Sequence, residues 1–580
     1  MKKWTLRPVQ KIPKEVEKLR LNSTTIQLLL ARNIKSPQKI EKFFESKYED
    51  LLSPSGLSGM SEAIERIGKA RKKNETITIF GDYDADGLTS SVLLKEVLEK
   101  IGFAPAVYIP DRNKEGYGLN IAAIDIIKSK YNPTLVITVD CGMSNWEEIK
   151  YAQKLGIEVI VTDHHSIPKK LPKSCIMINP KFPGQKYPFL DLAGVGVAFK
   201  LVQAIFEKFL PEKIDQLKWF LDIVAIGTIA DCVPLVEENR IFAKFGLIVL
   251  QKTKRTGLQE IIRSARLPIG EKNPPTAENI AFQIGPRLNA SGRMDHASLA
   301  LDLLLENDPV NARILALEVE SKNTQRQKMS QQVYQEVKSA IDDKKDHKLI
   351  VRSGKHWPLG IVGVVAGRIC DEYHCPVFLF KEEKDLLEGS GRSIESFDIV
   401  SAVSALDRYT EKYGGHKQAM GLKIKPENVK IFEKELLKMI EKEYDAEKWG
   451  NKLLIDTEVR PEEIDWDLHT EIKKFEPFGQ GNREPVFLSK NLVIREIKMV
   501  GNGQKHLKFV FGIEKSPPET DQPLADKILE GIFWKSGERF PEFKPRDKIK
   551  AVFRLRSNEW NGSRKLELNI IDIRRDPTAI

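Results

Sequence analysis

The feature that most constrains this chain is a short series of carboxylates placed directly after an apolar stretch. Thr76–Phe80 is apolar and β-branched and is followed by Gly81, which predicts a buried strand. The next residues carry three acids at alternate positions, Asp82, Asp84 and Asp86. Three carboxylates on one strand-to-helix turn repel one another and lose hydration, so a cation is expected to compensate them. Carboxylate oxygens suit Mg²⁺ or Mn²⁺.

Two simpler interpretations compete with a catalytic metal site. The first is a Ca²⁺ loop of the EF-hand type, which needs a helix before the loop and a glutamate six residues after Gly87. Leu93 stands at that position, so the sequence excludes an EF-hand. The second is that the acids only cap the helix that begins near Leu88. The crowding of three acids favours the metal site.

Composition limits the class of protein. A chain of 580 residues is long enough for about three or four domains. The net charge of +10 and the pI near 9.0 favour an anionic partner such as nucleic acid. Five cysteines without zinc-type pairing indicate a reduced, cytoplasmic protein. No apolar stretch reaches transmembrane length, and the charged start does not resemble a signal peptide, so no membrane association is expected.

Apolar β-branched stretches alternate with helical patterns in the first part of the chain. We expect strands at 76–80, 106–110, 134–139 and 158–162, with helices at 87–100, 120–130 and 146–155. This order predicts a doubly wound α/β domain with a mainly parallel sheet. In such a sheet, ligands bind outside the carboxyl ends of the strands.

Polar residues follow the predicted strands at that edge. Asp140 comes directly after one strand, Asp163 precedes His164 and His165 after another, and Asp231 follows an apolar helical stretch. A single such acid usually caps a helix, but repetition at one edge favours a shared site. Adjacent histidines in extended chain point in different directions. One of them is therefore expected to bind a metal and the other to face the substrate.

These residues belong to short motifs that resemble those of the DHH phosphoesterases in order and spacing: GDYDADG at 81–87, VDCG at 139–142, TDHH at 162–165 and ADCVPL at 230–235. Further segments are similar to motifs of the RecJ branch of that family: LAGVGVAFKL at 192–201, GPRLNASGRM at 285–294, EGSGRS at 388–393, GGHKQAMG at 414–421 and FEPFGQGNREPVF at 475–487. The resemblance covers nearly the whole chain.

The resemblance implies a centre of two Mn²⁺ or Mg²⁺ ions. Asp84 and Asp140 would hold one ion, with Asp140 bridging, and Asp86, His164 and Asp231 would hold the other. Asp82 is either a further ligand or a residue that orients the ligands. Some relatives carry a histidine where Phe80 stands here, so the first ion would depend more on Asp82 or on water. The resemblance makes Asp84, Asp86, Asp140 and His164 catalytic, and places His165 at the scissile phosphate or the leaving oxygen.

The resemblance also implies a phosphate pocket. Gly389-Ser390-Gly391 alone would usually be a turn, but its small residues let a phosphate approach the backbone. The residues implied to hold the 5′ end are Arg112, Arg293, Ser390 and Arg392, and His416 would bind a nucleotide phosphate near the metals. A terminal phosphate held at a fixed distance from the metals would explain exonuclease rather than endonuclease action.

Residues 309–346 contain no glycine or proline after Pro309 and predict one long connecting helix, or two helices with an unmarked break. Lys322, Arg326 and Lys328 in its middle would be able to contact a phosphate backbone. From residue 450 short alternating strands predict a barrel, and the resemblance makes it an OB-fold. The expected strands are 452–459, 485–488, 492–500, 506–513, 528–534, 547–556 and 565–573. Candidate DNA contacts there are Lys505, Lys508, Phe509, Phe533, Trp534, Arg554, Arg556 and Trp560, although most of these aromatic residues would serve equally well as barrel core.

The expected fold class is therefore α/β, with a doubly wound parallel-sheet DHH domain, a long connecting helix, a second smaller α/β domain of DHHA1 type and a C-terminal OB-like β-barrel. The expected divisions are a helical preface (1–55), the DHH domain (56–308), the helix (309–346), the DHHA1-like domain (347–435) and the barrel (450–580).

The resemblance implies a single-stranded-DNA-specific 5′-to-3′ exonuclease that releases mononucleotides by two-metal hydrolysis in DNA recombination and repair. One alternative is a DHH phosphodiesterase of short oligoribonucleotides or cyclic dinucleotides. Another is a non-catalytic single-strand-binding replication scaffold, which would require missing ligands. Expected partners are single-stranded DNA, single-strand-binding protein and a RecQ-type helicase, and the expected state is a monomer.

Overall fold

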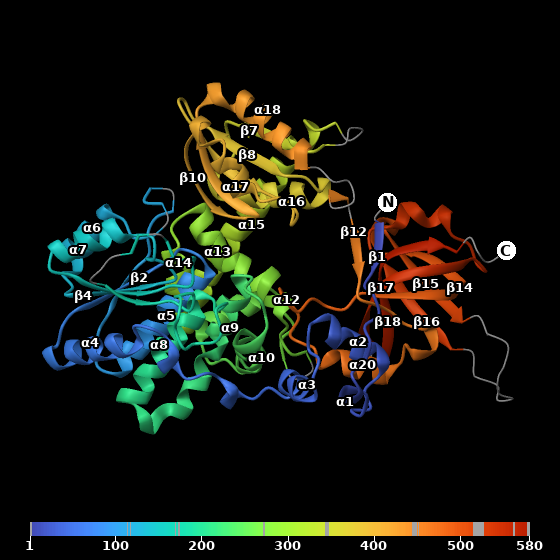
Figure 1. The fold of residues 1–580 in the computed structure, drawn as a ribbon, viewed down its shortest axis with the longest axis horizontal. Helices are drawn as coiled ribbons and strands as arrows, with labels where there is room; N and C mark the ends of the chain where they lie inside the picture. The colour runs from blue at the N-terminus through green and yellow to red at the C-terminus, as the bar shows by residue number, and fades with distance from the viewer. Residues whose placement is uncertain are drawn as a thin grey trace. The chain divides into compact units, whose positions relative to one another are not determined.

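The computed structural model of the chain forms two compact units (Figure 1). Unit 1 comprises Met1–Lys47 with Asn451–Ile580, and unit 2 comprises Tyr48–Gly450. The structure describes residues 3–112, 114–116, 118–168, 170–171, 175–270, 273–342, 347–443, 449–450, 452–513, 527–560 and 563–576. Within these residues no helix combines the length and apolar character needed to cross a membrane. All five cysteines are free thiols.

Unit 2 contains a five-stranded parallel sheet, which confirms the doubly wound prediction. Its strand order is β3 (Ala106–Tyr108), β2 (Ile77–Gly81), β4 (Leu135–Val139), β5 (Glu158–Thr162) and β6 (Ile176–Ile178). The chain leaves β2 toward β3 on one side and later returns to β4 on the other. The carboxyl ends of β2 and β4 therefore flank the topological switch point, where α/β sheets bind ligands.

Alternation along the strands gives this sheet two apolar faces. Ile79 packs into the core formed with α4 (Met60–Lys73) and α5 (Ala85–Lys100). Phe80, the next residue, packs into the core formed with α6 (Ile121–Tyr131) and α7 (Trp146–Lys154). Figure 1 shows α6 and α7 on one side of the sheet and α4 on the other. Phe80 is fully buried in this second core.

A group of mainly helical elements completes the first lobe of unit 2: η1 (Tyr48–Asp50), η2 (Pro54–Gly56), α8 (Gly194–Phe209), η3 (Pro211–Phe220), α9 (Leu221–Ala230), α10 (Glu237–Gln251), α11 (Thr256–Ser264), α12 (Ala277–Asn279), η4 (Ile280–Ile284), α13 (Gly285–Met294) and α14 (Ser298–Leu305). The α9 helix is buried along nearly its whole length, because it packs between α5 and α10. It carries Asp231 at its carboxyl end.

The connecting helix α15 runs from Pro309 to Ser339 without a break, so the alternative of two helices is wrong. Pro309 occupies the first turn, and Asp308 caps it by accepting hydrogen bonds from Val310 and Asn311. The helix ends earlier than expected: Ala340–Asp342 are not helical, and 343–346 lie outside the described residues.

A second, mixed sheet follows, in the order β10 (Thr410–His416), β11 (Ala419–Ile424), β9 (Leu387–Arg392), β8 (Val377–Glu382) and β7 (Ile350–Gly354). It packs with α16 (Leu359–Tyr373), α17 (Ile399–Ser404), η5 (Asp407–Tyr409) and α18 (Pro426–Glu443). The Gly-Ser-Gly segment is not a turn but lies within β9. Gly389 is required there because a Cβ would lie 2.1 Å from the Leu379 carbonyl oxygen of the neighbouring strand.

Unit 1 contains a closed five-stranded barrel. Its strands pair in the order β14 (Phe487–Val500), β15 (His506–Ile513), β16 (Ile528–Phe533), β18 (Ser563–Arg575) and β17 (Lys548–Trp560), and β17 pairs back to β14. The pairing of β16 with β18 is parallel and the others are antiparallel, which is the OB-fold arrangement. Between β14 and β15 lies η7 (Asn502–Gln504), and η8 (Gly537–Glu542) follows β16.

Three details of unit 1 differ from the sequence prediction. The expected strand 452–459 is divided into β12 (Lys452–Ile455) and β13 (Thr457–Glu458), whereas the two strands expected at 485–488 and 492–500 form one bent strand, β14. The helix α20 (Trp466–Lys473) was not expected, and η6 (Pro461–Glu463) precedes it.

The N-terminal segment was expected to be helical, but it begins with a strand. β1 (Lys3–Leu6) pairs in parallel with β12. It is followed by the helices α1 (Lys14–Glu17), α2 (Ser23–Ala31) and α3 (Pro37–Phe44). Trp4 donates a hydrogen bond to Asp572 at 2.7 Å, and Arg32 donates one to Asn482 at 2.9 Å. The segment is therefore built into unit 1 rather than standing alone.

Candidate metal centre and phosphate site

The carboxylates after β2 are positioned by the first turn of α5. Asp84 caps this helix: its Oδ1 accepts the amide hydrogens of Asp86 at 2.9 Å and Gly87 at 3.1 Å. Gly87 is needed because a Cβ would lie 2.5 Å from the Asp82 carbonyl oxygen. The turn therefore brings the three acids together at the switch point. Capping of α5 uses only Oδ1 of Asp84, so it does not explain both oxygens of this carboxylate.

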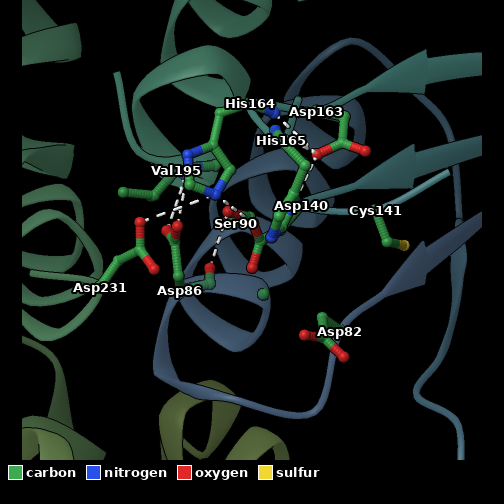
Figure 2. Close-up of polar contacts among 12 residues, drawn as sticks. Asp82, Asp86, Ser90, Asp140, Cys141, Asp163, His164, His165, Val195 and Asp231 are labelled. Atoms are coloured by element: carbon green, nitrogen blue, oxygen red, sulfur yellow. Dashed lines mark hydrogen bonds and ion pairs between the residues drawn. The ribbon is translucent and has the colours of Figure 1, made fainter. Parts of the chain in front are cut away.

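Asp86 is held from the opposite side by the first turn of α8. Its two carboxylate oxygens accept hydrogen bonds from the amides of Gly194 at 2.7 Å and Val195 at 2.8 Å (Figure 2). A Cβ on Gly194 would lie 2.4 Å from Oδ1 of Asp140. The glycine therefore lets the α8 amides and Asp140 approach the same small volume.

Asp140 directly follows β4 in a left-handed backbone conformation, with a φ of 61°. Aspartate tolerates this conformation better than most residues. Its amide donates to the Thr162 carbonyl oxygen at 2.9 Å, so the turn is tied to the neighbouring strand. The side chain is buried and lies among the other acids.

The two histidines point to different partners, as the extended chain predicted. Nε2 of His164 lies 3.2 Å from Oδ1 of Asp140 and 3.6 Å from Oδ2 of Asp231. Nδ1 of His165 lies 2.7 Å from Oδ1 of Asp163 (Figure 2). Asp163 also accepts the amide hydrogens of both histidines and of Met143. Asp163 therefore fixes both the backbone of this turn and the orientation of the His165 ring.

The described ligand atoms form three overlapping groups whose members lie within 4.8 Å of one another: Asp82, Asp84 and Asp140; Asp86, His164 and Asp231; and Asp140, His164 and His165. Asp140 and His164 each belong to two of these groups. All six sequence-predicted metal ligands are brought together, and Asp82 joins the group of Asp84. His165 was not expected as a ligand but also reaches Asp140.

The charges at this edge of the sheet favour a cation. Burial and the neighbouring carboxylates raise the pKa of Asp82, Asp140 and Asp231 well above the usual range, and that of Asp86 to about 7. Burial and His165 lower the pKa of His164 to about 3, which keeps this imidazole neutral. Its buried Nε2 has no hydrogen-bond partner among the described residues. Carboxylate oxygens and one neutral imidazole are a donor set that fits Mn²⁺ or Mg²⁺.

Asp163 and His165 form an ion pair next to this cluster. Burial opposes ionisation of Asp163, but the hydrogen bond from His165 holds its pKa below the usual value. Burial also opposes protonation of His165, yet Asp163 raises its pKa. His165 is therefore a cationic or proton-donating group beside the acids.

A cavity of about 310 Å³ lies against the acids, lined by Asp82, Tyr83, Asp84, Arg112, Asp140, His165, Ala230, Asp231, Asn289, Gly292 and Arg293. Oδ1 of Asn289 accepts the amide hydrogen of Ala85 at 2.7 Å, and so ties α13 to the first turn of α5. The Arg112 guanidinium lies over the Tyr83 ring at 5.0 Å. The cavity combines acids with two arginines, as a phosphodiester beside metal ions requires.

The remaining predicted substrate residues, Ser390, Arg392 and His416, come from the second lobe of unit 2, which Arg293 of α13 also contacts. Arg293 donates to the Gly360 carbonyl oxygen at 3.3 Å, in the first turn of α16. Arg392 donates to Oγ of Ser390 at 2.5 Å, and a Cβ on Gly363 of α16 would lie 2.8 Å from Nη2 of Arg392. The first residues of α16 therefore lie next to both Arg293 and Arg392. The N-terminal end of a helix favours bound anions.

His416, at the end of β10, contributes the fifth predicted substrate residue. Its ring stacks on that of His165, with centroids 6.4 Å apart and an angle of 13° between the planes. This contact brings the second sheet to the edge of the acid cluster. The structure therefore brings all five predicted substrate residues, Arg112, Arg293, Ser390, Arg392 and His416, around one region of unit 2.

Three residues that organise this region were given no role of their own in the sequence prediction: Asp163, Asn289 and Tyr83. Each lies inside a motif that was recognised, TDHH, GPRLNASGRM and GDYDADG respectively. Their position in these motifs was therefore a usable signal, but their roles depend on contacts between distant segments.

Two of the aromatic candidates in the barrel are core residues, which is the alternative that the sequence left open. Phe509 and Phe533 are buried, at 0% and 9% exposure, because they alternate into the barrel interior. Arg556 pairs with Glu484 and Lys508 with Glu530. Trp534 is 52% exposed and packs edge-on against His506. The side chain of Trp560 lies outside the described residues.

Comparison with known proteins agrees with this geometry. Family models match as the DHH family N-terminal domain at residues 76–228, the DHHA1 domain at 346–442 and the RecJ OB domain at 455–572. The chain is 36% identical over 575 residues to the single-stranded-DNA-specific exonuclease RecJ of Bacillus subtilis, covering 98% of this chain and 70% of that protein. It is 30% identical to the enzyme of the same name from Escherichia coli, covering 94% and 95%.

A solved structure gives the same result. The RecJ of Thermus thermophilus in complex with Mn²⁺ superposes with a TM-score of 0.82 at 26% identity, covering 99% of this chain and 80% of that one. The Mg²⁺ complex of RecJ from that organism gives a TM-score of 0.76 at 25% identity, covering 99% and 78%. The chain thus belongs to the RecJ family of single-stranded-DNA-specific exonucleases.

Proposed function

We propose that this protein degrades single-stranded DNA from the 5′ end and releases mononucleotides by metal-dependent hydrolysis of the terminal phosphodiester. The observation that carries the proposal is that a cluster of acids and a group of arginines lie next to each other in unit 2. Six side chains suited to bind metal ions lie together at the switch point of the sheet, and Arg112 and Arg293 line the cavity beside them.

In this proposal two divalent cations are held by the acid cluster. Asp84 and Asp140 would bind one, and Asp86, His164 and Asp231 the other, with Asp82 beside the first. When bound, such ions lower the pKa of water and neutralise charge that develops on phosphate oxygens. Without them, the raised pKa values of Asp82, Asp86, Asp140 and Asp231 express burial and the crowding of like charges.

The other side chains orient and stabilise the substrate. Asp163 holds Nδ1 of His165, and the ring lines the cavity, where it is suited to donate a proton or hydrogen bond to a phosphate oxygen. His416 belongs to the second lobe and stacks on His165, and from that position it would bind a phosphate of the DNA. Arg112 and Arg293 supply the positive charge of the cavity.

The direction of degradation follows from the terminal-phosphate pocket. Arg112, Arg293, Ser390 and Arg392 would hold the 5′-phosphate at the start of α16, while the next phosphodiester lies at the acids. A strand fixed by its end exposes one bond at a time to hydrolysis. The barrel of unit 1 would bind further nucleotides of the strand.

Recombination and repair are the processes that require such degradation. As partners we propose single-strand-binding protein and a RecQ-type helicase, which would supply the strand, and we propose a cytoplasmic monomer. Retention of the protein on immobilised single-strand-binding protein, and its absence from a column blocked with that protein's C-terminal peptide, is the expected outcome of a pull-down.

The test uses a 5′-phosphorylated, 3′-labelled DNA single strand with Mn²⁺, beside its duplex, an RNA copy and a dinucleotide. We expect stepwise shortening of the single-stranded DNA alone. The Asp140→Asn protein should be inactive, since asparagine keeps the left-handed backbone of residue 140 but removes the bridging charge.

Two results would contradict the proposal. Cleavage confined to RNA or the dinucleotide would identify a phosphodiesterase of short oligonucleotides. Tight binding of the single strand without cleavage in any metal would identify a scaffold, although the clustered ligands argue against a degenerate site.

A further inference from the structure

Arg326, on the connecting helix α15, has an unusual environment for an arginine. The buried side of α15 is formed by Ala312, Ala316, Val319 and Asn323, at helical spacing. Arg326 is the next residue on this side, three positions after Asn323. Its side chain therefore follows the buried face of the helix rather than pointing to solvent, in contrast to the exposed Lys328.

Two ion pairs fix where this side of α15 faces. Arg287 pairs with Glu320 at 2.5 Å, and Lys322 pairs with Asp295 at 2.7 Å. Arg287 lies in α13 and Asp295 directly follows it. The end of α13, which carries Arg293, is therefore placed against the turn of α15 that carries Arg326.

The hydrogen bonds of Arg326 leave it without an anionic partner. Nη2 donates to Oδ1 of Asn323 at 3.0 Å, and Asn323 is only 1% exposed. Nε is buried and has no hydrogen-bond partner among the described residues, in which no carboxylate pairs with this guanidinium. Burial and the nearby Arg287 lower the pKa of Arg326.

Arg293 is in a similar situation. Its guanidinium donates a hydrogen bond to a neutral carbonyl oxygen, that of Gly360. Burial, then Arg112 and Arg326, lower its pKa to about 10. Arg293 and Arg326 lie close together, and neither forms an ion pair with a carboxylate of the described residues. Guanidinium groups in this situation repel each other and are expected where an anion of high charge binds.

We propose that Arg326 is a further substrate-binding residue that, with Arg293, binds the terminal phosphate of the DNA strand. This inference rests on the proposed function and extends it, because it adds a group from the connecting helix. A terminal phosphate carries up to two negative charges, against one for an internal phosphodiester. The additional guanidinium therefore gives preference for a phosphorylated end over a hydroxyl end.

The test measures binding without cleavage, by fluorescence anisotropy in EDTA, of one single strand with either a 5′-phosphate or a 5′-hydroxyl. Loss of a charge-assisted hydrogen bond should make Arg326→Gln bind the phosphorylated strand about tenfold more weakly, and leave the hydroxyl strand within about twofold. Arg326→Lys should lose less affinity for the phosphorylated strand, because lysine keeps the positive charge.

Arg313→Gln is the matched control, because Arg313 lies on the same helix with a side chain that is 57% exposed and 3.5 Å from Glu260. It should change neither affinity. Thermal unfolding of each variant verifies that it is folded.

Asn323→Asp separates binding from structure. The substitution keeps the shape of Asn323 but places a carboxylate beside Arg326. If Arg326 binds phosphate, this internal partner should weaken binding of the phosphorylated strand without loss of stability. If Arg326 only supports α15, binding should be unchanged, and the inference is wrong.

The outcomes also separate this inference from the proposed function. A wild-type protein that neither binds nor cleaves single-stranded DNA would overturn the proposed function. A wild-type protein that cleaves but binds both ends equally, or an Arg326→Gln protein that keeps the preference, would overturn this inference alone.

Discussion

At the scale of single residues, the site depends on a carboxylate that binds no substrate in our proposal. Asp163 accepts hydrogen bonds from three backbone amides and from His165, and is 1% exposed. It therefore sets the path of the chain between the two histidines and the orientation of the His165 ring. Residues of this kind, which orient ligands, usually matter nearly as much as the ligands.

We predict that Asp163→Asn lowers exonuclease activity about 10- to 100-fold, because the amide cannot stabilise the charged or correctly oriented His165 ring. Thermal stabilisation by millimolar Mn²⁺ should persist, since the six predicted ligands remain. The measurement is the rate of single-strand degradation together with the Mn²⁺-induced change in Tm.

Asp125→Asn is a suitable control, because Asp125 is exposed and accepts a hydrogen bond from the Tyr151 hydroxyl, away from the acids. Equal activity losses in the two variants would show that the effect of Asp163 is not specific to the site.

At the scale of elements, the first turn of α8 supports two ligands at once. Its amides bind Asp86, and the missing side chain of Gly194 leaves room for Asp140. The helix N-terminus also stabilises the negative charge of Asp86. One turn of helix thus joins a ligand of the first proposed ion to a ligand of the second.

We predict that Gly194→Ala reduces activity at least about 100-fold, since its Cβ would lie 2.4 Å from Oδ1 of Asp140 and displace that carboxylate. Gly196→Ala, two residues along, should be nearly neutral, because the nearest contact of its Cβ would be the Leu192 side chain at 3.3 Å. Activity of the two variants, compared at equal folded fraction, checks this. Similar activities would mean that Asp140 can move without penalty.

The α20 helix of unit 1 provides a pH-dependent element. Burial, with Lys473 and Arg564, lowers the pKa of His469 from 6.5 to about 4. The folded state then binds this proton less readily than the unfolded state. The stabilising effect of the neutral ring is complete above about pH 6.5 and is lost as the pH falls toward about 4, by at most about 3 kcal/mol.

We expect hydrogen exchange of the α20 amides, corrected for its intrinsic pH dependence, to show easier opening at the acidic end of this window. His469→Gln should remove the difference, because glutamine has no proton to gain. If α20 amide exchange in His469→Gln still depends on pH in this window, the effect belongs to other groups.

At the scale of the whole molecule, a separate unit carries the OB barrel, and part of its positive charge is neutralised by internal ion pairs such as Lys508 with Glu530 and Lys565 with Glu530. Trp534, exposed beside His506, is the described aromatic of the barrel best placed to stack on a base.

We predict that Trp534→Ala raises the KM for long single strands about tenfold, the cost of one stacked base, and leaves kcat on short strands unchanged. Trp219→Ala is the control, because Trp219 is similarly exposed, at 55%, but belongs to unit 2. An unchanged KM in Trp534→Ala would remove this residue from the DNA path.

The sequence was sufficient to predict the parallel sheet and the cluster of acids and histidines at its edge. Apolar β-branched stretches such as Ile77–Phe80 and Leu135–Val139 are strands for local reasons, and the acids follow them directly. The resemblance supplied Arg112 and Arg293 of the first lobe and Arg392 of the second, which no local pattern connects to the acids.

What could not be predicted depends on contacts between distant segments. The strand character of Gly389–Arg392 comes from β8 and β11 on either side, which require glycine at their close approach. Phe509 and Phe533 could not be assigned to the core until the register of the barrel was known. Asn289 accepts the amide hydrogen of Ala85 only because α13 packs against α5, which the sequence does not reveal.

The pairing of β1 with β12 has a consequence for synthesis on the ribosome. Residues 3–47 emerge first, but the strand and barrel that they pack against are translated after the whole of unit 2. Unit 2 can fold as soon as it leaves the exit tunnel, because domains generally fold as units during translation. The N-terminal helices must meanwhile keep apolar residues such as Leu28 and Leu29 exposed. We therefore expect nascent chains of this protein to depend on chaperones until translation of unit 1 is finished.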